Sequence, residues 1–180
     1  MSATIKRKKM KIRITASINR IGATTERVLT EVGDALGIDE FVVTSTQRKP
    51  RTQATAMYEN IANGRNIRYK WAGEQVCDLC RTMRGHKKPK EEIIAAMTKR
   101  IEELSNQGYR VSKHCVSDAV YDRTNVIDVS YRNIPTATAI EAIKAFAQRI
   151  EVVKIIQPLS YRLQGYDAAE PAIHLEIRQA

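Results

Sequence analysis

The sequence predicts an α+β fold with a mixed, mainly antiparallel central sheet and helices packed on one face of that sheet. Apolar and polar residues alternate strictly in "IHLEIR" (173–178), as they do in a strand with one buried face. Apolar residues recur at helical spacing in "PKEEIIAAMTKRIEELSNQG" (89–108), which predicts an amphipathic helix. Helical segments are interspersed with strands early in the chain and strands cluster late, an order typical of α+β folds.

Short patterns predict the elements of the first half of the chain. Alternation in "KIRITAS" predicts a strand over 11–17, and the apolar run "FVVTS" predicts a short buried strand over 41–45. Helical periodicity predicts helices over 24–37 and 51–64, each ended by a glycine, the residue most often found just after a helix. A short helix is also predicted around 73–83.

The second half of the chain opens with its clearest helix. Pro89 and two glutamates suit the start of that helix, and Gly108 suits its end. An irregular loop, "CVSDAVYDRT", is expected after the next strand. The remaining predicted elements are strands over 109–114, 125–131, 151–157 and 172–178, and a helix over 136–150.

Composition restricts the domain organisation and the partners. The 180 residues, 43% of them hydrophobic, suit a single domain over 1–180 that begins with a basic N-terminal arm over 1–10. The formal net charge of +10 favours anionic partners, and nucleic acid, an acidic membrane surface and bacterial cell wall all qualify. Three cysteines, an odd number, argue against a disulfide framework.

The sequence contains no pattern typical of a signal peptide or of a membrane span. The N-terminus carries basic residues without the apolar core of a signal peptide, so synthesis in the cytoplasm is expected. Because no run of about 18 apolar residues occurs, no membrane span is expected. No pattern fixes the oligomeric state.

Three polar residues on late strands form the candidate metal site. Of only three histidines in the chain, His114 and His174 fall on polar positions or ends of predicted strands, and so does Asp128. Two imidazoles and one carboxylate are a common ligand set for catalytic Zn²⁺, with a fourth position left to water. The alternative for each residue is an ordinary hydrogen-bonded place on the surface.

Four short segments carry a family resemblance: "TSTQRKPRTQA" (44–54), "VSKHC" (111–115), "NVIDVS" (125–130) and "IHLEI" (173–177). In this order they resemble motifs of the zinc D-Ala-D-Ala carboxypeptidase and L-alanyl-D-glutamate peptidase family, which has the hedgehog/DD-peptidase fold. The resemblance spans about residues 41–178. It implies a zinc metallopeptidase that hydrolyses an amide bond in peptidoglycan stem peptides. Such an enzyme would act at the cell wall or periplasm after release or injection, as a phage endolysin does, or in the cytoplasm.

The resemblance also implies roles for single residues. Arg48 in "STQR" is similar to the family's arginine that contacts the substrate, a task that suits a permanently charged, bidentate guanidinium. Ser45 and Gln53 match weaker substrate-binding positions nearby. Zinc ligation is implied for His114, Asp128 and His174.

Two assignments stay open in this comparison. The interval before the ligand aspartate is longer than in the family, so Asp122 competes with Asp128, although the hydrophobic strand pattern favours Asp128. The family's general base is an acidic residue three positions before the last histidine, where this chain has Pro171. Glu170, one residue earlier, and Glu176, on the same strand face as His174, are the two candidates for the base.

Two other functions are weighed against the peptidase. The basic segments "KRKKMK" (6–11) and "RGHKKPK" (84–90) would suit a nucleic-acid-binding protein, which is not favoured because the aromatic residues do not interleave with them. A protein of the same fold could also bind metal or wall peptide without cutting it. "CDLC" (77–80) lacks a fourth zinc ligand at suitable spacing, so free thiols on a helix are expected there.

Overall fold

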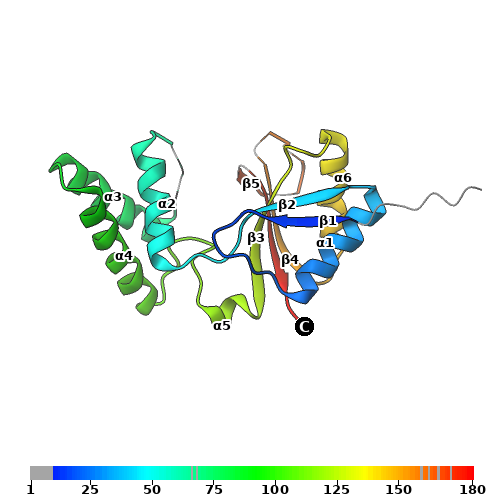
Figure 1. Cartoon of the computed structure of the whole chain (residues 1–180), viewed down its shortest axis with the longest axis horizontal. Coiled ribbons are helices and arrows are strands. Elements are labelled where there is room, and N and C mark those ends of the chain that lie inside the picture. The colour runs from blue at the N-terminus through cyan, green and yellow to red at the C-terminus, as the bar shows by residue number, and fades with distance from the viewer. Residues whose placement is uncertain are drawn as a thin grey trace, which may run out of the picture. The chain divides into compact units, whose positions relative to one another are not determined.

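The chain has an α+β fold with a mixed sheet, as predicted (Figure 1). The structure, a computed structural model, describes residues 10–65, 67, 69–158, 160–161, 163–165, 167–170 and 172–180, with side chains for all of these except 167–170. Apart from Met10, the predicted basic arm lies outside these residues. The chain divides into two compact units. The sheet unit comprises the residues up to Gln47 and from Ala119 onward, and the helical unit comprises Arg48–Asp118.

The sheet unit contains all the strands described. Its strand order is β1-β2-β3-β6-β4-β5. The outer pairs β1/β2 and β4/β5 are parallel, and the pairs between them are antiparallel, which makes the sheet mixed. The elements are β1 (Lys11–Ile14), α1 (Ala23–Leu36), β2 (Glu40–Ser45), β3 (Thr124–Ser130), α6 (Thr136–Ala147), β4 (Val152–Pro158), β5 (Asp167–Glu170) and β6 (Ile173–Arg178).

One face of the sheet packs against helices α1 and α6 to form the core of this unit. Alternation sends every second side chain of β3 and β6 to this face, where the exposed fraction falls to 0%. Phe146 of α6 reaches Phe41 of β2, with ring centroids 5.7 Å apart. The strand residues of this core include Phe41, Val43, Ile127, Val129, Ile173, Leu175 and Ile177.

Truncating Phe146 should destabilise the sheet unit strongly. The ring is fully buried in the core, so Phe146→Ala leaves a cavity, and we expect the free energy of unfolding to fall by about 3–5 kcal/mol. Urea denaturation followed by circular dichroism measures this loss. Glu141→Ala, at an exposed position of the same helix, is the control and should change stability by about 0.5 kcal/mol or less. Equal stability of the two variants would contradict this packing.

The helical unit has its own core. It consists of α2 (Pro50–Ala62), α3 (Trp71–Gly85) and α4 (Lys90–Asn106), whose apolar stripes face one another. The predicted packing of helices on one face of the sheet therefore holds for α1 and α6, and it is wrong for these three helices. Periodicity shows which face of a helix is apolar but not what covers that face. The core residues include Met57, Val76, Ile94, Met97 and Ile101.

The segment that follows α4 differs from its prediction. Residues 109–114 do not form the predicted strand, because their backbone bonds locally: the Cys115 N–H donates to the Ser112 carbonyl and the Val116 N–H to the His114 carbonyl. The irregular loop expected next contains a short helix, α5 (Asp118–Tyr121). Strand β5 was not predicted at all. The sequence pattern of "YRVSKH" resembles that of a strand, but strand pairing depends on distant partners.

No helix in the described part of the chain is long and apolar enough to cross a membrane.

Candidate metal centre

The strand alternation that builds the core also places two of the predicted ligands. Asp128 on β3 and His174 on β6 are direct cross-strand partners, so both side chains point to the same face of the sheet. Their sequence neighbours Ile127, Ile173 and Leu175 lie in the core on the opposite face. The rigid β3/β6 pair therefore fixes the relative position of this carboxylate and this imidazole.

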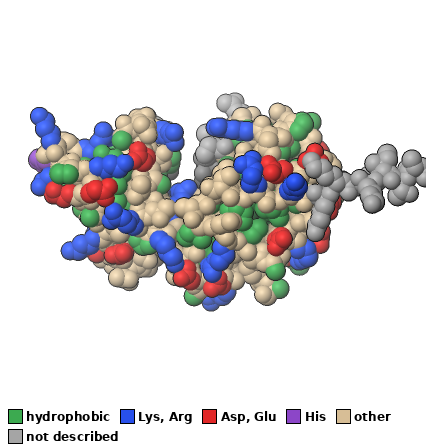
Figure 2. All heavy atoms as spheres, viewed as in Figure 1, with side chains coloured by type: hydrophobic (Ala, Val, Ile, Leu, Met, Phe, Trp, Pro, Cys, Tyr) green, Lys and Arg blue, Asp and Glu red, His purple; other side chains and the backbone are tan. Residues whose placement is uncertain are grey.

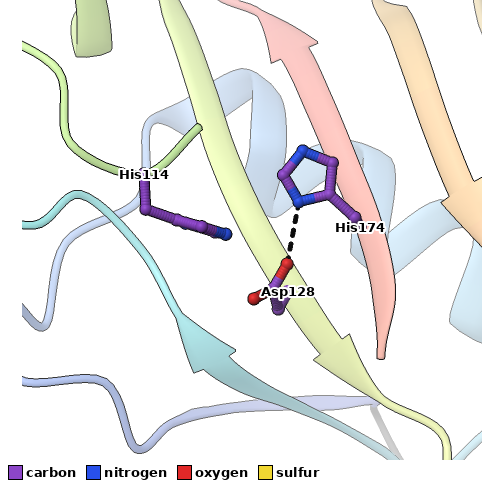
Figure 3. A group of neighbouring side chains, drawn as sticks. All are labelled: His114, Asp128 and His174. Atoms are coloured by element: carbon purple, nitrogen blue, oxygen red, sulfur yellow. Dashed lines mark hydrogen bonds and ion pairs between the residues drawn. The ribbon is translucent and has the colours of Figure 1, made fainter. Parts of the chain in front are cut away.

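The three predicted ligands lie together in the structure (Figure 3). Each of His114, Asp128 and His174 offers one ligand atom, and these atoms all lie within 4.8 Å of one another. His174 Nδ1 is 2.8 Å from Asp128 Oδ1. The ring of His114 points toward the other two side chains, and the group could hold a metal ion.

Burial strengthens the electrostatics of this group. The exposed fraction is 0% for His174 and 6% for His114, and that of the Asp128 side chain is 15%. Charges removed from water interact more strongly with one another and with a bound cation than charges on the surface do. Asp122, the other acidic residue considered as a ligand, has different surroundings. It is exposed and pairs with Arg20 at 3.0 Å.

The donor set fits Zn²⁺. Nitrogen and carboxylate oxygen are both common zinc ligands, and three protein ligands leave one position for water or substrate. Two ligands bound to the same tetrahedral zinc at about 2.0–2.1 Å lie about 3.3 Å apart. The 2.8 Å contact and the 4.8 Å limit of the group bracket this separation.

Ser45 lies next to this group in the sheet. It is in register with Asp128 on the neighbouring strand β2, and its exposed fraction is only 4%. The hydroxyl of Thr44, which the sequence did not single out, donates to the Asp128 carbonyl at 3.4 Å. The only feature of the sequence that pointed to Thr44 was its position beside Ser45 in "TST".

Arg48 and Gln53 lie together in the helical unit. Arg48 Nη1 donates to Gln53 Oε1 at 3.4 Å, and the Arg48 backbone N–H donates to the His114 carbonyl at 2.8 Å. Gln53 is 1% exposed, and its buried Nε2 has no hydrogen-bond partner among the residues that the structure describes. Burial raises the pKa of the neighbouring Cys115 thiol to about 11, a rise that the charges of Arg48 and Arg110 oppose.

The two candidates for the general base have different surroundings. Glu176 is two residues beyond His174 on β6, with its Oε1 3.6 Å from His174 Nε2. Glu170 ends β5, where its backbone is in register with Pro158 of β4. The side chain of Glu170 and the whole of Pro171 lie outside the described part of the structure.

Other motifs of the sequence lie in the helical unit. Cys77 and Cys80 are free thiols buried in α3, as expected, and burial raises the pKa of Cys77 to about 11. His86 is exposed at the end of α3. Trp71 and Tyr109 are both exposed and in contact, with ring centroids 4.9 Å apart.

Figure 2 shows Lys and Arg side chains interspersed with Asp and Glu on the surface of the helical unit, which holds fifteen Lys and Arg against eight Asp and Glu.

No protein-family model, curated protein or solved structure matches this chain significantly.

Proposed function

We propose that this chain is a zinc-dependent peptidase. The observation that carries the proposal is the group of two imidazoles and one carboxylate, His114, Asp128 and His174, on largely buried positions. A histidine pair with one carboxylate and an open fourth position is the ligand pattern of catalytic zinc rather than of structural zinc. When bound, such an ion supplies a water of lowered pKa and polarises the substrate carbonyl.

The proposed substrate is an amide bond in a peptidoglycan stem peptide, either D-Ala-containing or L-Ala-D-Glu. This part of the proposal is supported by the ordered resemblance of four segments to the D-Ala-D-Ala carboxypeptidase family, and the hedgehog/DD-peptidase fold of that family is part of what we propose. The positive charge of the chain suits an anionic cell-wall polymer. Cell-wall lysis is therefore the proposed biological role.

The proposed roles of the chain's own residues follow from their chemistry. Arg48 would hold a substrate carbonyl or carboxylate through its planar fork, and Gln53 would restrict the rotation of Arg48 through their side-chain contact. Ser45, in register with Asp128, would contribute a polar group beside the ligands. Either Glu170 or Glu176 would accept the proton of the attacking water.

Metal analysis combined with a peptide assay tests this function. We expect about one zinc per purified chain, and release of D-Ala or cleavage of L-Ala-D-Glu from synthetic stem peptides. A chelator should stop the hydrolysis, and added zinc should restore it. A zinc-free protein that cuts neither peptide would refute the proposal. Metal-independent, salt-sensitive binding of an oligonucleotide would favour the nucleic-acid alternative.

Replacing Arg48 by lysine should lower kcat/KM without unfolding the protein. Lysine keeps the positive charge but cannot make two parallel hydrogen bonds, so we expect a loss of about 10–100-fold on a D-Ala-containing peptide. Arg51→Lys is the matched control, because Arg51 is exposed in the first turn of α2, three residues after Arg48, and pairs with Glu91. Parent activity in Arg48→Lys would show that Arg48 does not bind the substrate.

A further inference from the structure

We propose that Glu176 is a positioning residue that holds the Nε2–H of His174 and so presents Nδ1 of that ring to the metal. This inference rests on the proposed metal site. It extends that proposal by assigning different roles to the two candidate glutamates. It uses three residues of the sheet unit only. These are Asp128 on β3 and His174 and Glu176 on β6.

The two ring nitrogens of His174 face different carboxylates. Nδ1 is 2.8 Å from Asp128 Oδ1, and Nε2 is 3.6 Å from Glu176 Oε1. Asp128 belongs to the group of candidate metal ligands, and Glu176 does not. Figure 3 shows the second ring nitrogen on the side away from Asp128. Nδ1 is therefore the nitrogen on the ligand side of the ring.

The chemistry of imidazole gives this asymmetry a consequence. A neutral imidazole has one protonated nitrogen and one free lone pair, and only the lone pair can bind a metal. If Nδ1 is the ligand, the proton must lie on Nε2, which then needs an acceptor. Histidine ligands commonly donate this second N–H to a carboxylate, which fixes the ring and makes the ligand more basic.

Glu176 is well placed to be that acceptor. Alternation along β6 puts it on the same sheet face as His174, and its side chain is only 15% exposed. The 3.6 Å separation is longer than a hydrogen bond, and a movement of the carboxylate by about half an ångström would bring it within range. No change of the backbone is needed, because both residues lie on one strand.

This assignment bears on the choice of general base. If Glu176 accepts the Nε2–H of His174, its carboxylate lies on the side of the ring away from Asp128, and the accepting oxygen is engaged in that hydrogen bond. Of the two candidates for the general base, Glu170 is then the one expected to accept a proton from water. The two glutamates would therefore differ in kind: Glu176 would act through His174, and Glu170 would act on the reaction itself.

Two substitutions at position 176 test the proposal. Glu176→Leu removes the acceptor, and we expect zinc affinity, measured by competition with a chromophoric chelator, to fall about 10–100-fold. Glu176→Gln keeps an acceptor oxygen, so its zinc affinity should fall less, and turnover at saturating zinc should stay within a few-fold of the parent. Glu141→Gln, a remote exposed glutamate, is the control. Nitrogen-detected NMR of the zinc-loaded parent should show the His174 proton on Nε2.

Several results would overturn the inference. Parent zinc affinity in Glu176→Leu, a proton on Nδ1, or a parent chain that binds no zinc would each do so. A hundredfold loss of turnover in Glu176→Gln with unchanged zinc affinity would instead make Glu176 the base. Weakened zinc binding in Glu176→Leu, in a protein that cuts no stem peptide, would support the inference and remove the proposed peptidase function. If Glu176→Leu does not fold, the glutamine variant and the NMR measurement decide.

Discussion

His174→Ala should abolish tight zinc binding. The proposed site has three protein ligands, and removing one leaves two, which rarely hold zinc against competing water. The loss should be especially complete at this position because the ring is fully buried between Asp128 and Glu176, so no nearby exposed side chain can replace it. Equilibrium dialysis followed by metal analysis gives the stoichiometry, and chelator competition gives the affinity.

His114→Ala should give the same result, and it guards against a folding defect in His174→Ala. His86→Ala is the matched control, because His86 is exposed at the end of α3 and belongs to no group of candidate ligands among the residues that the structure describes. Thermal melting in the presence of a chelator shows whether each variant is folded. Unchanged zinc stoichiometry in both ligand variants would sink the assignment of this site.

Glu170→Gln should lower turnover by at least about a hundredfold while zinc stays bound. The substitution preserves size and hydrogen bonding but removes the group that accepts a proton from water, and general base catalysis typically contributes this much. Glu170 ends β5, which β4 separates from the strand β6 that carries His174, and it is favoured because the resembled family places its acidic residue before the last histidine.

The comparison with position 176 makes this test specific. Glu176→Gln should keep turnover within a few-fold at saturating zinc, and Glu141→Gln should leave it unchanged. Release of D-Ala under single-turnover conditions, with metal content measured on the same samples, separates loss of chemistry from loss of zinc. Full activity and full zinc in Glu170→Gln would show that the base lies elsewhere.

Part of this site could be predicted from the sequence because strand alternation is a local property. The pattern of "NVIDVS" and "IHLEI" places Asp128 and His174 on polar faces, and the structure pairs these two residues across β3 and β6. His114 was proposed as a ligand from its place at the end of a predicted strand and from its motif, and that strand prediction is wrong. Its segment is held by turns and by the hydrogen bond from Arg48, a residue distant in sequence.

Long-range pairing explains what could not be predicted. The register of Ser45 with Asp128 depends on which strands are neighbours, and no local pattern gives that order. The separate core of α2, α3 and α4 was missed for the same reason, since an apolar stripe does not identify its partner. Which ring nitrogen of His174 faces which carboxylate depends on side-chain rotamers that only the structure shows.

The helical unit also changes how the sheet must assemble. Strands β2 and β3 pair directly, although residues 46–123 separate them. The ends of the helical unit are held together by the Lys49–Asp118 ion pair at 2.6 Å and by the bond from Arg48 to His114. If this unit folds first, the pairing of β2 with β3 closes a short effective loop instead of one of about 80 residues, which saves roughly 2 kcal/mol of loop-closure entropy. Destabilising the α2–α4 core, for example with Met97→Ala, should therefore slow the refolding of the sheet in stopped-flow experiments, although Met97 belongs to no strand.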